Sequence, residues 1–364
     1  MTPVPSDQDH RFPCDTCGSD LRFAPDTGLL VCDHCGNTEE ISDANATPIR
    51  ELDFERMVRQ QFNQSETEET RVSSCPNCGA VVEFDPTAHA AECPFCATPV
   101  VADTGPHRHI KPAGVAPFEI TESDARDAMN NWLGKLWFAP SGLQDYARKG
   151  RRLSGIYVPY WTYDADTRTA YSGLRGDTYY ETRRVMVDGE SRQRKVAKTR
   201  WRPKSGRVAR AFDDILVSAT RSLPQRYTTD LAPWELDKLS PYAPGFLAGF
   251  RSEAYTIPLD EAFKTARAIM DRRITRDIKF DIGGDKQRIQ SAKTDISDIT
   301  FKHVLLPVWI AAYKYRGKSF RFVVNGQTGK VRGERPWSIL KIAIAVIFAL
   351  GVAAAIGYFS AEAQ

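Results

Sequence analysis

Eight cysteines in two matching quartets constrain this chain more than any other feature of its sequence. Each quartet consists of two Cys-x-x-Cys pairs separated by 14 residues, and the second quartet repeats the first 61 positions later. Four thiolates with this spacing are typical of a closed tetrahedral zinc site, so the sequence predicts two Zn²⁺ ions per chain. The predicted ligands are Cys14, Cys17, Cys32 and Cys35 for one ion, and Cys75, Cys78, Cys93 and Cys96 for the other.

The residues around each quartet favour a small β-ribbon built on the metal. Gly18, Gly36 and Gly79 directly follow a pair and permit the positive φ that such a knuckle needs. A unit of about 25 residues cannot bury a core large enough to fold unaided, so the metal is expected to supply folding energy. Disulfides are the alternative, but Met1 to His10 lacks the pattern of a signal peptide. Four sulfurs close each site, which favours a structural rather than a catalytic zinc.

Changes in composition along the chain, together with its proline- and glycine-rich stretches, indicate a multidomain α+β protein. We expect two small β zinc ribbons of rubredoxin-like form, a larger mixed α+β domain with mainly antiparallel strands, and one C-terminal transmembrane helix. The predicted boundaries are ribbon 9–40, connector with a short helix 41–70, ribbon 71–102, Pro- and Gly-rich linker 103–117, α+β domain 118–335 and transmembrane helix 339–359.

Inside the large domain, apolar periodicity predicts two helices, 121–136 and 259–278, the first capped by Thr121 or Ser123. Runs of β-branched and aromatic residues predict strands over 153–163, 167–172, 178–187, 193–202, 207–217, 300–315 and 318–324. The stretch Gly155 to Trp161 resembles Val304 to Trp309, and each follows a predicted helix. A duplicated helix-then-strand unit explains this likeness, with chance similarity of two core strands as the alternative, and both tryptophans are expected in the core.

The C-terminal run from Ile342 to Phe359 contains 18 residues without a charge. As a helix it spans roughly 27 Å, which matches the hydrocarbon thickness of a bilayer. Trp337 and Tyr358 stand where interfacial aromatic residues belong, and basic residues precede the run while only Glu362 follows it. These features predict a single-pass protein of the inner (cytoplasmic) membrane with its N-terminal domains in the cytoplasm; a buried helix is the alternative.

A basic stretch between Arg183 and Arg210 is the main candidate for binding outside the zinc sites. On a strand, its side chains would alternate between two faces, with Lys198, Arg200, Arg202 and Lys204 on one and Trp201 on the other. Nucleic-acid phosphates, anionic lipid headgroups and an acidic protein are all possible partners. The candidate patch comprises Arg183, Arg184, Arg194, Lys195, Lys198, Arg200, Arg202 and Lys204.

The sequence offers no enzyme signature of comparable strength. Gly317-Lys318-Ser319 lacks the earlier glycine of a phosphate-binding loop, because Ala312 occupies that position. Asp281 and Asp285 are a weak candidate for a metal site, and His107 and His109 are expected to be solvated. The formal net charge of +3 is near neutral, so total charge does not favour nucleic acid. We therefore expect no catalytic site.

The chain resembles a bacterial family of TFIIB-type zinc-ribbon membrane proteins. The resemblance rests on the cysteine quartets and on the stretches Tyr157–Tyr163, Asp281–Asp285, Asp298–His303 and Gly333–Trp337. Such proteins often carry a primosomal helicase name (primosomal protein N′, replication factor Y, superfamily II helicase). A helicase of that class requires two ATP-binding lobes. The motifs of those lobes are absent here, so the resemblance implies zinc, membrane attachment and protein assembly rather than a reaction.

These observations together favour a membrane-tethered adaptor that recruits protein partners at the cytoplasmic face of the membrane. The alternative is a membrane-tethered nucleic-acid-binding protein that uses the ribbons and the basic stretch of residues 183–210. The expected partners are accordingly one or more proteins and the lipid bilayer, with nucleic acid as the second possibility.

Overall fold

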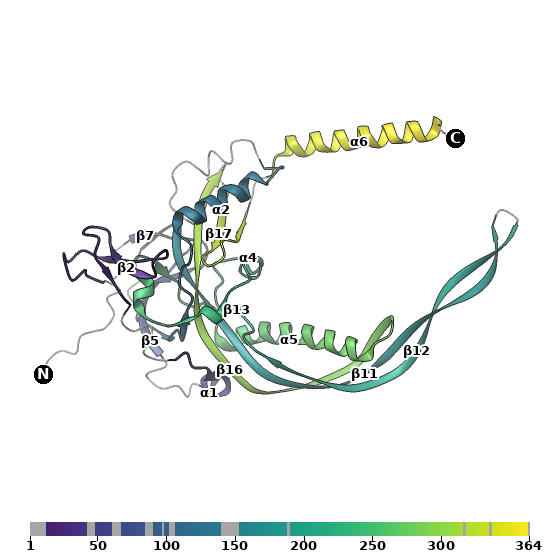
Figure 1. The fold of residues 1–364 in the computed structure, drawn as a ribbon, viewed down its shortest axis with the longest axis horizontal. Helices are drawn as coiled ribbons and strands as arrows, with labels where there is room; N and C mark the ends of the chain where they lie inside the picture. Colours follow the sequence, from purple (N-terminus) through teal and green to yellow (C-terminus); the bar gives the residue numbers. More distant parts are fainter. Residues whose placement is uncertain are drawn as a thin grey trace.

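Figure 1 shows the computed structural model, which describes residues 12–41, 48–59, 67–83, 90–96, 98–101, 106–139, 153–187, 190–315, 318–334 and 337–362. The chain is mixed α+β with mostly antiparallel sheets, as predicted, and it carries both cysteine quartets. A body at one end holds the cysteine quartets and most of the core. A long curved sheet projects from the body and carries a helix in its concave side (Figure 1).

The large sheet has ten strands, and three very long strands dominate it. Its main path runs in the order β12 (Glu190–Phe212), β11 (Ser154–Val187), β16 (Lys286–Tyr315), β10 (Gly114–Val115) and β14 (Ser240–Pro241). Shorter strands join the body end of the sheet: β4 (Leu52–Asp53), β13 (Val217–Ser218), β15 (Arg251–Ser252), β17 (Lys318–Asn325) and β18 (Val331–Gly333).

Small sheets build the two ribbons. The first contains β1 (Leu21–Ala24), β2 (Leu29–Cys32) and β3 (Thr38–Glu39). The second contains β5 (Thr67–Ser74), β6 (Val81–Glu83) and β9 (Pro106–Ile110), beside the pair β7 (Ala90–Glu92) and β8 (Pro99–Val101). The helices are α1 (Phe54–Val58), α2 (Glu122–Gly134), α4 (Gln225–Asp230), η2 (Leu236–Lys238), η3 (Pro244–Leu247), α5 (Leu259–Ile282) and α6 (Ile339–Glu362).

The long strands correct the sequence prediction. The separate strands expected between 153 and 217 form a continuous hairpin of β11 and β12, and β16 begins at Lys286 rather than at Thr300. Register shifts interrupt the pairing of β11 with β16 at Asp164/Asp166 and at Ser172/Gly173. Such bulges bend and twist a strand, which accounts for the curvature of the sheet. At about 3.3 Å per residue, the 34 residues of β11 reach roughly 110 Å.

We call the projecting part of the sheet the arm: residues 166–187 of β11, 190–211 of β12 and 286–297 of β16. Helix α5 covers one face of the arm, the inner face, through a stripe of buried residues that recur mostly every fourth position. The stripe consists of Leu259, Ala262, Ala266, Met270, Ile274, Ile278 and Ile282. Past Gly176 and Lys286 the arm continues as a two-stranded hairpin without the helix.

The structure gives the two halves of the duplicated unit equivalent contacts. The Trp161 indole donates to the Ile257 carbonyl at 3.0 Å, and the Trp309 indole donates to the Ile120 carbonyl at 3.1 Å. Short strands that precede the two helices also pair in matching ways: β10 lies parallel to β16, and β15 lies parallel to β11. These exchanged contacts support duplication over chance similarity, and both tryptophans are buried as expected.

The segments expected as connector and linker are part of the fold. The predicted linker 103–117 contains β9 and β10, and Val115 of β10 is completely buried. The connector contains β4 and the short helix α1, as expected, and β4 pairs with β16 through Leu52 and Phe301. Proline and glycine marked 103–117 as a boundary, but its backbone extends two sheets: β9 pairs with β5 of the second ribbon, and β10 pairs with β16 and β14 of the large sheet.

Candidate metal centres and basic arm

The first cysteine quartet has the geometry of a zinc site. Cys14 Sγ lies 3.6 Å from Cys35 Sγ, and Cys17 Sγ lies 3.5 Å from Cys32 Sγ. Tetrahedral Zn–S bonds of about 2.3 Å separate sulfurs by about 3.8 Å, so the four thiols fit one ion. Both knuckles close through a backbone hydrogen bond, from Gly18 to Cys14 and from Gly36 to Cys32. The two glycines have φ of 73° and 77°, which explains why glycine follows each pair.

The second quartet repeats this arrangement. Cys75 Sγ lies 3.5 Å from Cys96 Sγ, and Cys78 Sγ lies 3.6 Å from Cys93 Sγ. In both quartets all four sulfurs lie within 4.8 Å of one another. The two quartets therefore fit two zinc ions per chain, with the eight ligands that the sequence predicted. Four sulfur donors leave no position for a substrate, so these centres can hold structure but offer no open coordination site.

Mutual contact shifts the pKa values of the clustered thiols. Burial opposes ionisation of Cys14, but hydrogen bonds from the backbone N–H groups of Thr16 and Cys17 and from the side chains of Cys35 and Asn37 together lower the Cys14 pKa to about 6. The hydrogen bond from Cys78 lowers the pKa of Cys93 to about 5, and the same contact raises the pKa of Cys78. In each quartet, some of the thiols therefore ionise easily, but all four cannot be negatively charged unless a cation lies between them. Zn²⁺ supplies that positive charge when bound.

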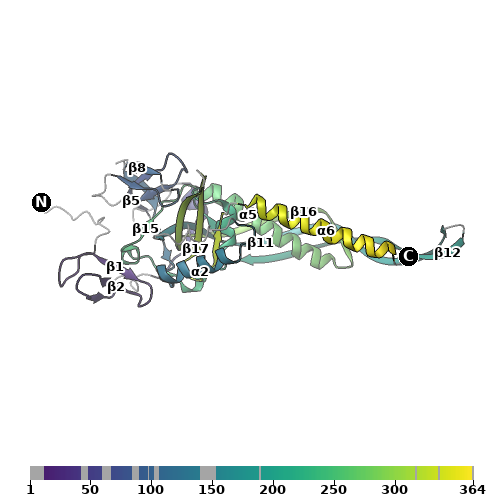
Figure 2. The ribbon, with the colours of Figure 1, turned by 90° about the horizontal axis from the view of Figure 1, so that it is seen from above.

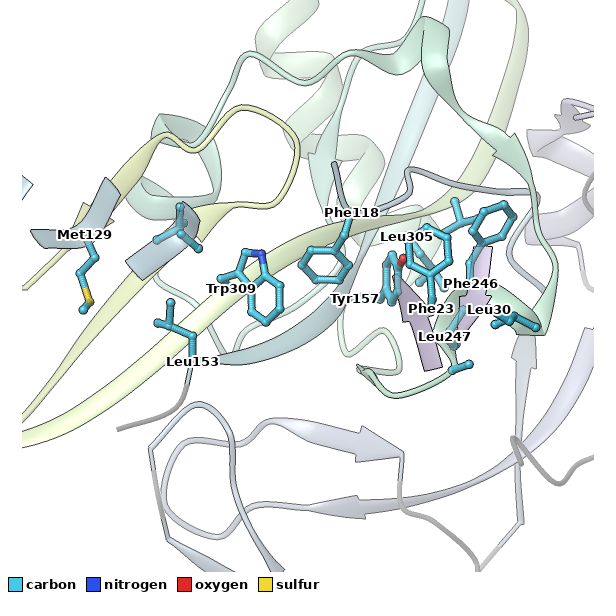
Figure 3. Packing of buried hydrophobic residues seen from close by; sticks show 14 of the residues in the cluster. Phe23, Leu30, Phe118, Met129, Leu153, Tyr157, Phe246, Leu247, Leu305 and Trp309 are labelled. Carbon is cyan, nitrogen blue, oxygen red and sulfur yellow. The ribbon is translucent and has the colours of Figure 1, made fainter. Parts of the chain in front are cut away.

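The first ribbon packs into the core of the body. The Phe23 amide donates to the Ala248 carbonyl at 2.9 Å, and the rings of Phe23 and Phe246 meet edge to face at 5.6 Å. Figure 3 shows an unbroken row of buried side chains from Phe23 through Tyr157 and Phe118 to Trp309. The first ribbon is therefore built into the body, while its ligands Cys17 and Cys35 remain exposed.

The second ribbon packs against the other side of the same segment. The Ala254 amide donates to the Val81 carbonyl at 3.1 Å, only six residues after the contact of Ala248 with the first ribbon. Phe95, inside the last knuckle, is completely buried, and Cys75, Cys93 and Cys96 are also buried. Figure 2 shows the ribbons on opposite sides of this end of the molecule, with β15 between them. The second centre is therefore the more deeply embedded of the two.

A buried carboxyl group lies near the second centre and was not predicted. Glu253 accepts hydrogen bonds from Thr220 Oγ1 at 2.6 Å and Ser222 Oγ at 3.0 Å. Burial raises its pKa to about 8, and the negative charge of Cys93 acts in the same direction. No sequence motif surrounds Glu253, and only the fold brings it to residues 31 and 33 positions away.

A second cluster of acidic side chains already contains its own cation. The carboxylates of Asp164, Asp213 and Asp214 lie within 4.8 Å of one another. The buried Lys302 ammonium lies 2.8 Å from Asp214 Oδ1 and 3.7 Å from Asp164 Oδ2. It also lies 3.1 Å from Glu51 Oε1, which fastens the segment before β4 to β16. These contacts give the cluster a structural role.

The weaker candidates from the sequence do not converge on a site. Asp281 accepts a hydrogen bond from Tyr171, whereas Asp285 accepts from the backbone amide of Thr178 at 2.7 Å. The expectation that His109 is solvated was wrong, because its ring packs edge to face on Tyr255 at 5.2 Å. The side chains of His107, Lys318 and Ser319, and all of Gly317, lie outside the described residues.

The inner face of the arm mixes basic and acidic side chains. Strand pairing places Arg183, Arg194, Lys198, Arg200, Arg202 and Lys204 on this face, as the predicted alternation requires. Glu181 pairs with Lys198, and Asp177 Oδ1 lies 2.9 Å from Arg175 Nε. The Arg200 guanidinium lies 5.2 Å from the centre of the Tyr179 ring. Part of the basic patch therefore has partners within the arm.

The outer face of the arm carries only basic charges over most of its length. No Asp or Glu occupies the outer-face positions of β11 from Ala170 to Arg184, or the positions paired with them on β12 and β16. Arg288 lies over the Trp201 ring at 4.3 Å, and Lys286 Nζ donates to Thr199 Oγ1 at 3.1 Å. The exposed cations of this face are Arg184, Lys195, Arg207, Lys286, Arg288 and Lys293.

Sequence reasoning found only part of this outer face. Arg184 and Lys195 belonged to the predicted patch, but Lys286, Arg288 and Lys293 lie on β16, which was expected to begin later. The strand register brings these β12 and β16 residues onto one face, because Leu174 of β11 pairs with Pro203 of β12 and with Arg288 of β16. Basic and neutral residues alternate over part of 286–293, and this pattern could have led to the prediction of a strand that begins at Lys286.

Helix α6 is the one candidate for a membrane span among the described residues. Its stretch Ile339–Ile356 is long and apolar enough to cross a bilayer, and none of that stretch is buried against the body. The helix leaves the body on the same side as the arm and runs in a similar direction (Figure 1 and Figure 2).

Comparison with known proteins supports the zinc ribbon. A family model described as the zinc-finger of RNA-polymerase I-specific TFIIB, Rrn7, matches residues 8–40. The chain is also similar to "Uncharacterized protein YdjG" of Bacillus subtilis (strain 168), with 26% identity over 344 residues, which is 91% of this chain and 92% of that protein. No solved structure matches the chain. Zinc ribbons of this type point to binding of nucleic acid or protein.

Proposed function

We propose that the protein is a membrane-anchored adaptor without catalysis of its own, and that the outer face of its arm recruits a protein partner with an acidic surface. The main support for this proposal is the arm, which continues past Gly176 and Lys286 as a two-stranded hairpin beyond the part that α5 covers. The paired outer-face positions from Ala170 to Arg184 hold no Asp or Glu, and no helix of the described chain covers them; Asp166 and Asp295 lie on the same face nearer the body. A face of one charge sign favours partners of the opposite sign and speeds their encounter.

Two further features support this proposal. Helix α6 offers an uncovered apolar stretch of bilayer length, and the basic residues before it favour a cytoplasmic body at the inner membrane. Both cysteine quartets are closed by four sulfurs, so they suit bracing of the body rather than a reaction. On this account the ribbons support the segment between them, α6 anchors the chain, and the arm presents the partner surface.

A photo-crosslinking amino acid tests the proposed surface without removing a charge. Ser205 lies on the outer face and Val196 on the inner face, since they pair with Ser172 and Glu181 respectively. In cells that express the intact protein, the probe at Ser205 should yield a discrete protein adduct in the membrane fraction. The probe at Val196 should not yield it. Identical adducts from both positions, or none from Ser205, would contradict the adaptor proposal.

The outer face also supports a second candidate, a membrane-tethered nucleic-acid-binding protein. The specific observation is Arg288 stacked on Trp201 beside Lys286, because planar and basic groups on an open sheet suit bases and phosphates. The match of residues 8–40 to a TFIIB-type zinc finger is consistent with this candidate.

Salt dependence distinguishes the nucleic-acid candidate. The intact protein in nanodiscs of neutral lipid should bind single-stranded oligonucleotides with an affinity that falls steeply as salt rises. Failure to bind at low salt would remove this candidate and leave the adaptor proposal standing.

A further inference from the structure

Exposed aromatic side chains gather where α6 leaves the body. Among the described residues, six large apolar side chains outside α6 are exposed: Val58, Trp137, Phe138, Tyr180, Phe280 and Trp337. Three of these, Trp137, Phe138 and Trp337, flank the first turn of α6, and they are 83%, 37% and 56% exposed. Isolated exposed apolar residues are ordinary, but here the Phe138 and Trp337 rings lie 6.4 Å apart, Trp137 is next to Phe138 in the sequence, and all three stand at the start of an uncovered apolar helix. We call these three residues the aromatic platform.

The body holds the α2 side of this platform rigidly. Thr121 and Asp124 form a reciprocal capping box at the start of α2, which confirms Thr121 as the predicted cap. Met129 and Leu133 of α2 are buried, and Trp132 meets the Phe322 ring of β17 at 5.5 Å. Trp137 and Phe138 follow directly after this fixed helix. Their exposure therefore cannot be relieved by a swing of α2 without disrupting the core.

The first turn of α6 is fastened to the same place. The Ser338 amide donates to the Phe138 carbonyl at 2.8 Å, and the Phe138 and Trp337 rings lie 6.4 Å apart. Lys341 reaches back from α6, and its ammonium donates to the Ala139 carbonyl at 2.8 Å. These contacts couple the direction of α6 to the body, and they keep the charge of Lys341 at the body end of the helix.

We propose that the aromatic platform inserts into the interfacial layer of the bilayer and sets the orientation of the body on the membrane. The inference rests on the membrane anchorage in the proposed function and adds a second lipid contact outside α6. Tryptophan prefers the level of the lipid headgroups, and the platform lies just before the apolar stretch begins at Ile339. Lys341 belongs at the same level, because a lysine near the end of a span reaches toward the interface.

Continuity with α6 identifies the occupant of this surface as lipid. Trp337 lies two residues before the exposed Ile339 and three before the exposed Leu340, and its ring lies 6.4 Å from that of Phe138, so one bilayer would cover the platform and the start of the helix together. An interfacial platform also restricts tilt, because lifting Trp137 out of the interface would expose a large aromatic side chain to water. The tilt of the body against the bilayer would then be fixed rather than left to a free hinge.

Tryptophan quenching in liposomes tests the inference with the intact chain. The protein is reconstituted into vesicles that contain phospholipid brominated near the headgroup end of its acyl chains. Of the seven tryptophans, Trp137 and Trp337 should be quenched, whereas the buried Trp161 and Trp309 should not. Trp137→Phe should therefore remove a quenchable part of the emission. The matched control Trp201→Phe, on the arm, should leave the quenchable part unchanged.

The outcomes separate this inference from the proposed function. If the chain does not float with the vesicles, membrane anchorage fails and the inference fails with it. If the chain floats but Trp137→Phe leaves quenching unchanged, the platform does not meet lipid and only the inference is overturned. Loss of quenching in Trp201→Phe instead would place the lipid contact on the arm, which also overturns it. Circular dichroism of each variant before reconstitution confirms that its fold is retained.

Discussion

At the level of single residues, the two zinc centres differ in how deeply the protein buries their ligands. Cys17 and Cys35 of the first centre are exposed, whereas Cys75, Cys93 and Cys96 of the second are buried among core residues of the body. Loss of a ligand from the second centre leaves an incomplete cluster inside the core. Loss of Cys17 or Cys35 from the first disturbs mainly the surface of one ribbon, whereas Cys14 and Cys32 are buried.

This difference predicts unequal effects of substituting an exposed ligand of the first centre and a buried ligand of the second. Cys17→Ser and Cys93→Ser should each lower the zinc content from two ions per chain to one. We expect Cys93→Ser to reduce stability by about 2 kcal/mol more than Cys17→Ser, or about 4–8 °C in Tm. Metal analysis and thermal unfolding measure the two effects. Equal losses of Tm would show that the second ribbon is not anchored more deeply than the first.

The buried Glu253 predicts a pH dependence of opposite sign to that of a salt-bridged acid. Because burial raises its pKa from 4.5 to about 8, the folded protein holds a proton that the unfolded chain has released between these values. Stability from this group is therefore full below about pH 4.5 and declines as pH rises toward 8. Glu253→Gln, which mimics the protonated acid, should remove this decline.

Thermal unfolding between pH 5 and pH 8 checks the Glu253 prediction. Relative to the native protein, Glu253→Gln should gain at least about 1 kcal/mol at the higher pH, or about 2–4 °C. Thr300→Val, which removes a hydrogen bond to Glu51 at a distant site, serves as a control: it keeps Glu253, so its stability should fall with pH in parallel with the native protein. A parallel pH profile for Glu253→Gln and the native protein would refute the burial of a protonated acid.

At the level of elements, the arm depends on close approach of α5 to the inner face. Gly173 permits this approach, because a Cβ there would lie 2.5 Å from the Arg288 carbonyl oxygen and 2.9 Å from Ile282 Cδ1. Ion pairs reinforce the contact, as Arg210 binds Asp277 through two bonds of 2.6 and 2.7 Å. Helix and sheet therefore form one rigid unit up to the two-stranded end of the arm.

Gly173→Ala should loosen this unit. The backbone carbonyl of Arg288 cannot move away cheaply, so we expect a cost of about 1–3 kcal/mol, with faster hydrogen exchange in α5 and in 286–297. Ala170→Ser, on the exposed outer face of the same strand, should leave both properties within error. Unchanged exchange in α5 for Gly173→Ala would mean that the helix does not depend on this contact.

Local patterns in the sequence could identify the helices but not the length of the strands. The cap at Thr121 and the apolar periodicity of α5 were sufficient to locate both helices. The long strands were divided because Gly173, Gly176 and Pro203 are ordinary signals of a break. In the fold, glycine admits close contacts in the sheet, and Pro203 is tolerated because β12 is an edge strand. Both effects depend on tertiary contacts, which the sequence of a single strand does not reveal.

At the level of the whole molecule, the chain is a body with two zinc ribbons at one end and an arm and α6 at the other. The metal ligands could be predicted completely, because each quartet is local in sequence. The basic outer face could not, because Lys286 and Trp201 become neighbours only through the pairing of Gly176 with both of their strands. The seating of the ribbons on Ala248 and Ala254 likewise arises from contacts distant in sequence.

Charge neutralisation on the two faces of the arm tests the adaptor proposal most directly. The outer triple variant carries Arg207→Gln, Lys286→Gln and Lys293→Gln, and the matched inner triple carries Arg194→Gln, Arg202→Gln and Lys204→Gln. Both remove three positive charges from exposed positions of the arm. Each intact protein is purified from membranes with its bound proteins, which are then quantified. We predict that the outer triple loses its partner about tenfold or more, consistent with a loss of about 1.4 kcal/mol, while the inner triple keeps it. Equal retention by both variants, or equal loss from both, would contradict the account.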